Sequence, residues 1–410
     1  MSLIELAIPF FLIAIVVEVF YGLFVKCQTY NFSDSVSSLQ LGMISRLIGL
    51  LRLSFAGLVV TKLVSFLGIT PYYGESWLIW CVYFVLYDFL YYWKHRYGHY
   101  WRIMWASHVA HHQSEEFNLS TALRQTGTDY LGFVFFLPLF FLGISSGTFI
   151  FIASVNLIYQ FWVHTEHIKR LGYLDKWLVT PSNHRVHHAT NTEYLDKNFG
   201  GVFIVWDRLF GTFCDERIDR VCHYGIRNSL RNWDPLWANV HVWVDTICVC
   251  FRTRGLWQKL SVWFRAPSWI PEDIDVSYVP EEAGGKYRPK VSLKSQIFVG
   301  IQFSVTSLAG IWLLMNQTLL SKEASFLSFI VVLVSYSLQS MALQKDKFVY
   351  LLECFRLLLI WLIFLYLMQS DLIFAQLVET VLGYYLLGSL CLVLVLACIQ
   401  LFGSSKHQWV

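Results

Sequence analysis

Residues 3–25 read LIELAIPFFLIAIVVEVFYGLFV, an apolar run slightly longer than the roughly 20 residues that a helix needs to cross a bilayer. The run has neither the basic start nor the small-residue cleavage site of a secretory signal, and it contains Glu5 and Glu18, so we expect a retained membrane helix. Comparable or longer apolar runs recur at about 41–67, 76–93, 130–163, 296–315, 325–343, 350–368 and 373–402. The sequence therefore predicts an all-α, polytopic membrane protein.

The composition excludes several classes of protein. Of the 410 residues, 56% are hydrophobic and 18% aromatic, but only 14% are charged, against about a quarter in an average soluble domain. The net charge of +3 is small and dispersed, so nucleic acid is not an expected partner. The nine cysteines are odd in number and include no Cys-x-x-Cys pair, so we expect free thiols rather than redox chemistry.

Turn-forming residues and charge divide the chain. The run 130–163 is too long for one span, and Pro138, Gly143 and the residues 145–147 in its middle predict a helical hairpin. Most of the charged residues, histidines and prolines lie in 94–128 and 164–295, which we expect outside the membrane. We predict N-terminal spans in 1–75, a functional core in 76–271, a linker in 272–295 and a four-span region in 296–410.

Lysine and arginine indicate the orientation. They collect between Lys94 and Arg124 and again between Lys169 and Lys294. Because basic loops stay on the cytoplasmic side, both polar stretches are predicted to face the cytoplasm. Six tryptophans in 233–271 are interleaved with basic residues, which favours interfacial helices in the headgroup region over a soluble tryptophan-rich core.

Histidine is the strongest functional signal. Ten of the 13 histidines form four clusters: His95 and His99; His108, His111 and His112; His164 and His167; and His184, His187 and His188. Residues three and four apart share a helix face, so we expect His-x-x-x-His and both His-x-x-His-His sets to point their imidazoles in one direction each. Three or four such faces can converge on metal, and more nitrogens than one tetrahedral ion uses predict two ions.

Spacing alone leaves other ligands open, because imidazole also suits zinc and copper. Bis-histidine haem is the main rival, but it needs single histidines that face each other across a bundle. A metal transporter should line its spans with buried His or Asp residues, whereas nearly all of these histidines lie in the predicted cytoplasmic stretches.

The order of the clusters resembles the fatty acid hydroxylase and sterol desaturase superfamily of membrane di-iron oxygenases. The shared order is His-x-x-x-His, His-x-x-His-His, Gln-x-x-x-His and His-x-x-His-His. The longer stretches DFLYYWKHR (88–96), HHQSEEFNLSTALR (111–124), HTE (164–166) and DKNFGGVFIVWDRLFGT (196–212) are most similar to the alkylglycerol monooxygenase subgroup and its bacterial relatives. The resemblance extends from about Tyr83 to Pro271.

This resemblance implies the iron ligands. They are His95, His99, His108, His111, His112, His164, His184, His187 and His188. Gln160 stands where some members have another histidine, so we expect it beside the metals, and His167 lies outside the motif. Asn183 replaces a histidine that often precedes the last cluster.

Carboxylates that orient the ligating imidazoles are expected nearby. Asp88 lies about two helical turns before His95 and on the same face. Glu166, Glu115 and Asp129 are further candidates, although Glu115 is also compatible with a solvated position. Asp207 and Arg208 are predicted to form a structural ion pair.

The resemblance also implies the reaction, an O2-dependent attack on a lipid C–H bond with two iron ions as cofactor. In the alkylglycerol monooxygenase subgroup, hydroxylation next to an ether oxygen gives an unstable hemiacetal that breaks down to an aldehyde and a glycerol, with tetrahydrobiopterin as reductant. A hydroxylase or desaturase of a sterol, sphingoid or fatty acyl lipid is the alternative, because the superfamily shares the metal motifs. No cytochrome b5 module, flavin fold or dinucleotide fingerprint is visible, so electrons are expected from an external pterin or redox protein. The expected location is the endoplasmic reticulum of a eukaryote or the inner membrane of a bacterium.

Overall fold

The computed structural model describes residues 3–72, 74, 76–272, 274, 285–316, 320–344, 349–368, 383, 385 and 388–397. Over these residues every regular element is a helix, and β-pairing is limited to three isolated bridges. The prediction of an all-α fold is therefore confirmed. The chain divides into two compact units, one of Met1–Arg231 and Trp237–Tyr287, the other of Asn232–Leu236 and Arg288–Val410.

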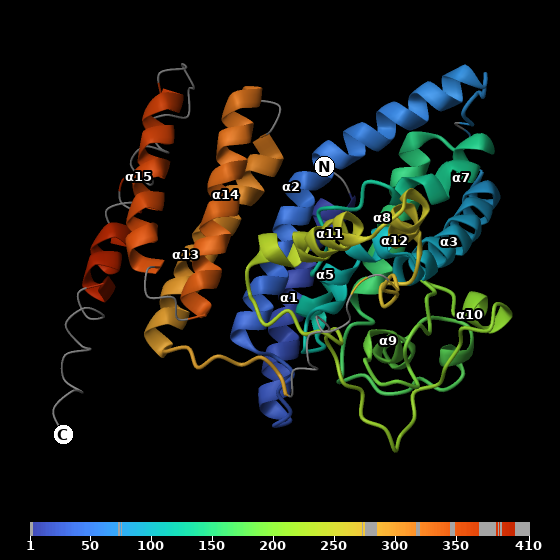
Figure 1. Cartoon of the computed structure of the whole chain (residues 1–410), viewed down its shortest axis with the longest axis horizontal. Helices are drawn as coiled ribbons and strands as arrows, with labels where there is room; N and C mark the ends of the chain where they lie inside the picture. Colours follow the sequence, from blue (N-terminus) through green and yellow to red (C-terminus); the bar gives the residue numbers. More distant parts are fainter. Residues whose placement is uncertain are drawn as a thin grey trace. The chain divides into compact units, whose positions relative to one another are not determined.

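The first unit contains long helices that support a group of short ones (Figure 1). Its longer helices are α1 (Leu3–Phe24), α2 (Phe32–Phe66), α3 (Trp77–Tyr100), α8 (Ser146–Phe161), α11 (Pro235–Arg252) and α12 (Leu256–Phe264). Its short helices are α4 (Arg102–Ala106), α5 (Val109–His112), α6 (Leu119–Ala122), η1 (Gly132–Phe136), α7 (Leu137–Phe141), η2 (Leu174–Lys176), α9 (Pro181–His188) and α10 (Val205–Leu209).

Three described helices are long and apolar enough to cross a membrane, namely α1, α13 (Leu293–Asn316) and α14 (Lys322–Leu343). They support a membrane protein. Helices α2, α3 and α15 (Val349–Met368) coincide with three more predicted runs, and α3 continues beyond its run to carry His95 and His99. Most of the predicted run 373–402 lies outside the described residues. The side of the membrane stays a prediction.

The break predicted within 130–163 is present. Helix α7 ends before Gly143, whose φ of +83° favours glycine, and α8 begins at Ser146. Phe136 and Phe149 bring the two arms together, with ring centroids 5.5 Å apart. Tyr87 of α3 stacks on Phe136 at 4.7 Å, so α3 packs against this hairpin.

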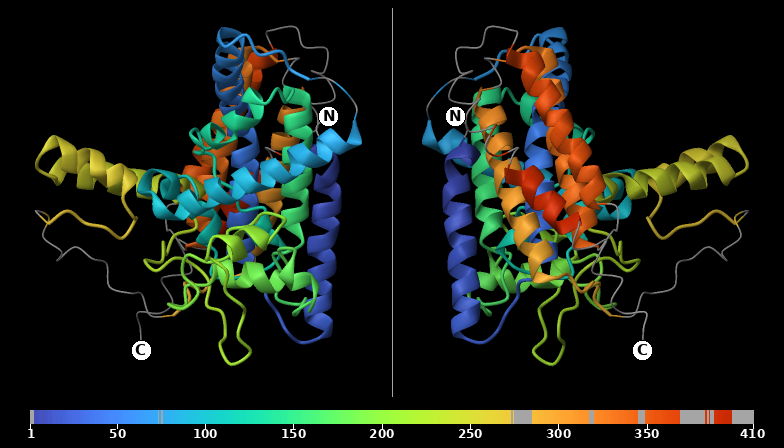
Figure 2. Two further views of the ribbon diagram at one scale, coloured as in Figure 1. Left: turned by 90° about the vertical axis from the view of Figure 1, so that its right-hand side faces the viewer. Right: turned by 90° about the vertical axis from the view of Figure 1, so that its left-hand side faces the viewer.

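The tryptophan-rich stretch forms α11 and α12, which extend away from α1 in Figure 2. Phe251 and Trp257 remain 79% and 78% exposed. Helix α12 contacts α4, and Arg102 at the start of α4 donates to the carbonyl of Pro267 at 2.7 Å. This helix pair is thereby joined to the segment that leads into the histidine cluster, and its place in the headgroup region stays a prediction.

In the second unit, α13, α14 and α15 pack in sequence around a polar interior. Glu353 and Arg356 are buried on α15 and form an ion pair. Arg356 also donates to Ser335 of α14 at 3.0 Å and to Gln302 of α13 at 2.8 Å. Buried charges in an apolar bundle need such partners, and here three helices supply them.

Candidate metal centre

Nine histidines of the first unit form two groups whose ring nitrogens are close enough to share metal ions. The first group is His95, His99, His108, His112 and His187, and the second is His111, His164, His184 and His188. Within each group the candidate ligand atoms all lie within 4.8 Å of one another. These are the nine histidines that the family resemblance implies as ligands. Among the described residues, His167, His223 and His241 belong to neither group.

Each His-x-x-His-His set is divided between the groups, which differs from the expectation that each set points in one direction. At α5, His108 and His112 join the first group and His111 joins the second. Helix α9 has the converse arrangement, with His187 in the first group and His184 and His188 in the second. Positions i and i+4 lie about 40° apart around a helix, whereas i+3 and i+4 lie about 100° apart. Each of the two short helices, α5 and α9, therefore contributes histidines to both groups.

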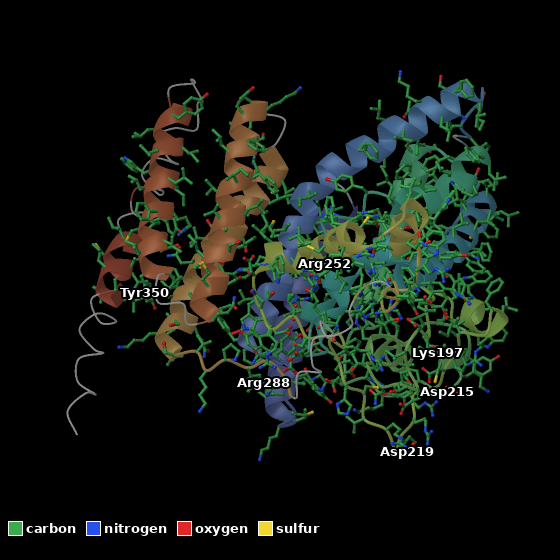
Figure 3. The ribbon with its side chains drawn as sticks, in the orientation of Figure 1. Lys197, Asp215, Asp219, Arg252, Arg288 and Tyr350 are labelled. Atoms are coloured by element: carbon green, nitrogen blue, oxygen red, sulfur yellow. The ribbon has the colours of Figure 1, made fainter. Side chains whose placement is uncertain are left out.

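Backbone carbonyls determine which ring nitrogen carries the proton. The Nδ1 atoms lie 2.9 Å from Phe199 O for His95, 3.0 Å from Arg124 O for His111, 2.8 Å from Gln160 O for His164, and 3.0 Å from Lys197 O for His187. Figure 3 labels Lys197 in the loop that follows α9. A carbonyl can only accept, so Nδ1 donates and the Nε2 lone pair is left for a metal.

The Nε2 atoms then meet as ligands around an ion would. In the second group, His164 Nε2 lies 3.3 Å from His111 Nε2 and 2.9 Å from His184 Nε2. His164 and His111 both donate through Nδ1, so their Nε2 lone pairs face each other and repel unless a cation lies between them. Ligands about 2.0–2.1 Å from a common ion are about 3 Å apart, which matches this spacing.

The first group shows the same close spacing of Nε2 atoms. His108 Nε2 lies 3.1 Å from His95 Nε2 and 3.1 Å from His112 Nε2. The buried Nε2 atoms of His99 and His187 have no hydrogen-bond partner. Because buried polar atoms are rarely left unpaired, both groups fit a bound metal ion.

Burial favours the neutral form of eight of these imidazoles. It lowers the pKa of His111 to about 4. For His164 and His184, burial is again the largest cause, and neighbouring imidazoles add to it, so the pKa falls well below the ordinary value. The pKa is lowered in the same way for His95, His108, His112, His187 and His188. Neutral imidazole is the form that binds metal.

Two buried aspartates shape the turn that orients His95. Asp207 accepts from the N–H groups of residues 199 and 200 at 2.7 and 2.8 Å. Asp88 accepts from the N–H groups of residues 202 and 203 at 2.8 and 3.0 Å. Between them the two carboxylates hold the turn whose Phe199 carbonyl accepts from His95. Asp88 is thus connected to His95 through the main chain.

The predicted ion pair between Asp207 and Arg208 is wrong. Asp207 is fully buried and also accepts from the hydroxyl of Thr212 at 2.7 Å, and burial raises its pKa to about 6. Arg208 donates to the carbonyl of Lys176 at 3.1 Å and lies over the ring of Phe213. Successive side chains on a helix diverge by about 100°, so the two residues face different surroundings.

Gln160 lies next to the second group, but its side chain has other partners. Its Nε2 donates to Asn156 Oδ1 at 2.6 Å, and its Oε1 accepts from Tyr91 at 2.8 Å. Asn156 donates in turn to Asp88 at 2.7 Å. Two of the predicted residues therefore belong to one buried network, and Gln160 touches His164 through its carbonyl.

Two of the other predicted carboxylates, Glu115 and Asp129, have partners other than the nine histidines. Glu115 accepts from the hydroxyl of Ser229 and from the N–H of Tyr287, both at 2.5 Å. Asp129 forms an ion pair with Lys94 at 2.7 Å. Glu166 lies two residues after His164 of the second group, and burial raises the pKa of its partly exposed carboxyl.

Sequence reasoning missed Arg124, which is 1% exposed. Its guanidinium donates to the Ala110 carbonyl at 2.8 Å and to Gln113 at 3.1 Å. Its own carbonyl is the acceptor for His111. A lone arginine shortly after a histidine cluster was the available signal.

Asn183 and Arg185 of α9 were also missed as structural residues. Asn183 Oδ1 accepts from the Thr180 N–H at 3.1 Å, within a capping box that fixes the start of α9. Arg185 donates twice to Glu216, both at 2.7 Å, and once to the Thr165 carbonyl at 2.8 Å. The Thr-Pro-x-Asn pattern at 180–183 was a readable cap signal.

Comparison with known proteins agrees with this geometry. The fatty acid hydroxylase family model matches residues 80–212, which include all nine histidines. Alkylglycerol monooxygenase of Danio rerio is 34% identical over 368 residues, covering 87% of this chain and 81% of the relative. The chain belongs to the alkylglycerol monooxygenase family.

Further relatives extend the family comparison. Alkylglycerol monooxygenase of Homo sapiens is 36% identical over 312 residues, or 73% of this chain and 68% of that protein. Ornithine lipid hydroxylase OlsE of Rhizobium tropici is 30% identical over 131 residues, or 32% of this chain and 40% of that protein. No solved structure matches the chain significantly. The nine histidines that the fold brings together all lie within the region that the fatty acid hydroxylase family model matches.

Proposed function

We propose that the chain is a membrane di-iron monooxygenase that hydroxylates a lipid C–H bond with O2. The observation that carries the proposal is the contact between His111 and His164, whose Nε2 lone pairs face each other at 3.3 Å in a buried group. A bound cation removes the repulsion between them. Family membership supports iron over zinc or copper.

The division of the histidines supports two ions, one held by the five residues of the first group and one by the four of the second. When bound, the iron ions supply the activation of O2 that side chains alone cannot perform. The protein brings nine imidazoles together and directs at least four of them through backbone carbonyls. Phe117 is fully buried, and its ring lies 5.2 Å from that of His188, so it excludes water from one side of the second group.

The substrate that we propose is an O-alkylglycerol. The support is the similarity to alkylglycerol monooxygenases over most of the chain. Hydroxylation of the carbon next to the ether oxygen gives a hemiacetal, which separates into a long-chain aldehyde and a glycerol derivative. We propose tetrahydrobiopterin as the reductant, with a redox protein as the other possible donor.

We further propose that the centre faces the cytoplasm, in the endoplasmic reticulum of a eukaryote or the inner membrane of a bacterium. Support comes from the basic residues of 94–128 and 164–295, the stretches that contain the histidines. We propose the oxygenase core at 76–271, between N-terminal spans in 1–75 and a linker at 272–295, with the four-span region at 296–410.

A second candidate is hydroxylation or desaturation of another lipid, such as a sterol, a sphingoid base or an acyl chain. The match to an ornithine lipid hydroxylase favours it, although that match covers only 32% of this chain. Both candidates use the same histidines.

One experiment separates the candidates. The purified full chain is incubated under O2 and reduced pterin with a panel of ether lipids, sterols and ceramides, and products are identified by mass spectrometry. For the wild type we expect an aldehyde from the alkylglycerol and about two irons per chain by elemental analysis. His111→Ala should release no aldehyde and should lose one or both irons. An intact ether with a hydroxylated or desaturated sterol or acyl product overturns the substrate, and wild-type protein without bound metal overturns the centre.

A further inference from the structure

Helix α1 carries a second acidic side chain, beyond Glu5 of its first turn, on an otherwise apolar span. Glu18 lies six residues before the end of α1 and is only 7% exposed, whereas Val17 and Phe20 are 60% and 66% exposed. Burying an ionisable side chain within a span costs free energy unless the side chain is paired, so Glu18 needs hydrogen-bond partners.

Three donors from outside α1 converge on this carboxylate. The hydroxyl of Thr165 donates to Oε1, the hydroxyl of Tyr30 donates to Oε2, and the N–H of Leu119 donates to Oε2 at 2.8 Å. Thr165 is separated from Glu18 by 147 positions in sequence and follows His164 of the second group directly. Glu18 thereby connects the first span to a metal-binding segment.

The same face of α1 makes two further contacts with this segment. Tyr21 packs edge-on against the ring of His167, with centroids 5.1 Å apart. Gly22 lies so close that an added Cβ would be 3.5 Å from His167 Nε2 and 3.0 Å from the carbonyl of Cys27. Positions 18, 21 and 22 are spaced three and four apart, so one stripe of α1 receives residues 165–167.

We infer that Glu18 is a positioning residue for the second metal ion, acting through Thr165 on His164. Thr165 is held on both sides, since its hydroxyl reaches Glu18 and its carbonyl accepts from Arg185 of α9 at 2.8 Å. His164 begins this segment and contacts His111 and His184 through Nε2. The inference rests on the proposed two-ion centre. It assigns α1 a role beyond anchoring, which is to fix one side of the second group.

Glu18→Leu tests this directly, because an apolar side chain cannot accept from any of the three donors. Thr165→Val removes the hydroxyl at the other end of the same bond and preserves side-chain shape, so it is informative even if Glu18→Leu folds poorly. Glu5→Leu is the matched control, since it makes the same change 13 positions earlier on α1. The full chain is purified in detergent, loaded anaerobically with Fe(II) and titrated with a chelator while iron per chain is measured.

Wild type and Glu5→Leu should retain about two irons per chain. Glu18→Leu and Thr165→Val should each hold one iron normally and release the second at roughly 10-fold lower chelator strength. The double variant should be no weaker than Glu18→Leu, because both changes break the same connection. Two irons of unchanged affinity in both variants, or equal loss of both irons with a lower melting temperature, overturn the inference. Wild type that does not bind two irons overturns the proposed centre instead.

Discussion

Asp88→Asn tests how far the buried turn controls the first metal group. Asp88 accepts four hydrogen bonds, two from the backbone of residues 202 and 203, one from Trp206 Nε1 at 2.9 Å and one from Asn156 at 2.7 Å. Asparagine keeps the shape but replaces one oxygen by an NH2 donor, and each oxygen of Asp88 accepts two of the four bonds. Either orientation of the amide therefore leaves two buried donors unpaired.

Each unpaired buried donor costs about 1–3 kcal/mol, so the variant should lose about 2–6 kcal/mol of unfolding free energy. The turn also carries the Phe199 carbonyl that directs His95, so iron in the first group should bind about 10- to 100-fold more weakly. Unfolding by denaturant in detergent measures the first effect, and iron retention under a chelator measures the second.

Asp215→Asn is the matched control for this experiment. Asp215 is an exposed residue that pairs with Arg170 at 2.8 Å, and exposed ion pairs contribute at most about 1 kcal/mol. The control should therefore keep both iron affinity and stability. Asp88→Asn protein with the stability and first-group affinity of wild type would refute the role given to the turn.

Three further predictions concern the protonation of His111, the start of α9 and the side of the membrane that the loop at Asp219 faces. Metal-stripped protein should lose stability as the pH falls from 6.5 to about 4, because His111 binds a proton in the unfolded chain but not in the folded chain, where it is buried. At about 1.4 kcal/mol per pH unit, His111 alone contributes roughly 3 kcal/mol. An unfolding free energy that does not change over this pH range contradicts the prediction. Thr180→Val removes a capping hydroxyl of α9 and should lower the unfolding free energy by about 1 kcal/mol, with an unchanged denaturation midpoint as the contrary result. An epitope inserted at exposed Asp219, labelled in Figure 3, should bind antibody only after the cells are permeabilised, whereas binding to intact cells places the loop outside.

The parts of this protein that are predictable from sequence are those encoded by local spacing. Helical periodicity and apolar length predict the all-α fold, and the break at Gly143 follows from turn-forming residues close in sequence. Short spacings also identify the ten clustered histidines, because ligands three or four positions apart lie on a common helix face. The family resemblance reduces the ten to nine, since His167 lies outside its motif. Their division into two groups depends on where each short helix points, which spacing does not specify.

The supporting residues were harder to predict because their partners are distant in sequence. Arg124 reaches Ser37 across 87 positions, and Thr165 reaches Glu18 across 147. Glu18 is visible in the sequence as an acidic residue in a span, but nothing local identifies its donors. Asp207 illustrates the opposite error, since its sequence neighbour Arg208 suggested an ion pair that the turn at 199–200 replaces.

The orientation of the histidines gives a general reason for this limit. We expect carboxylates to direct the ligating imidazoles, and Asp196 does lie 3.5 Å from Nδ1 of His99. His95, His111, His164 and His187 instead donate to main-chain carbonyls. Every residue has a carbonyl, so sequence alone cannot identify which one accepts. What the sequence does contain is the set of side chains that hold those carbonyls in place. Asp88 and Asp207 fix the acceptor of His95, and Arg124 ties the acceptor of His111 to α5, so the buried charges around this centre act one bond further from the metal than a side-chain motif suggests.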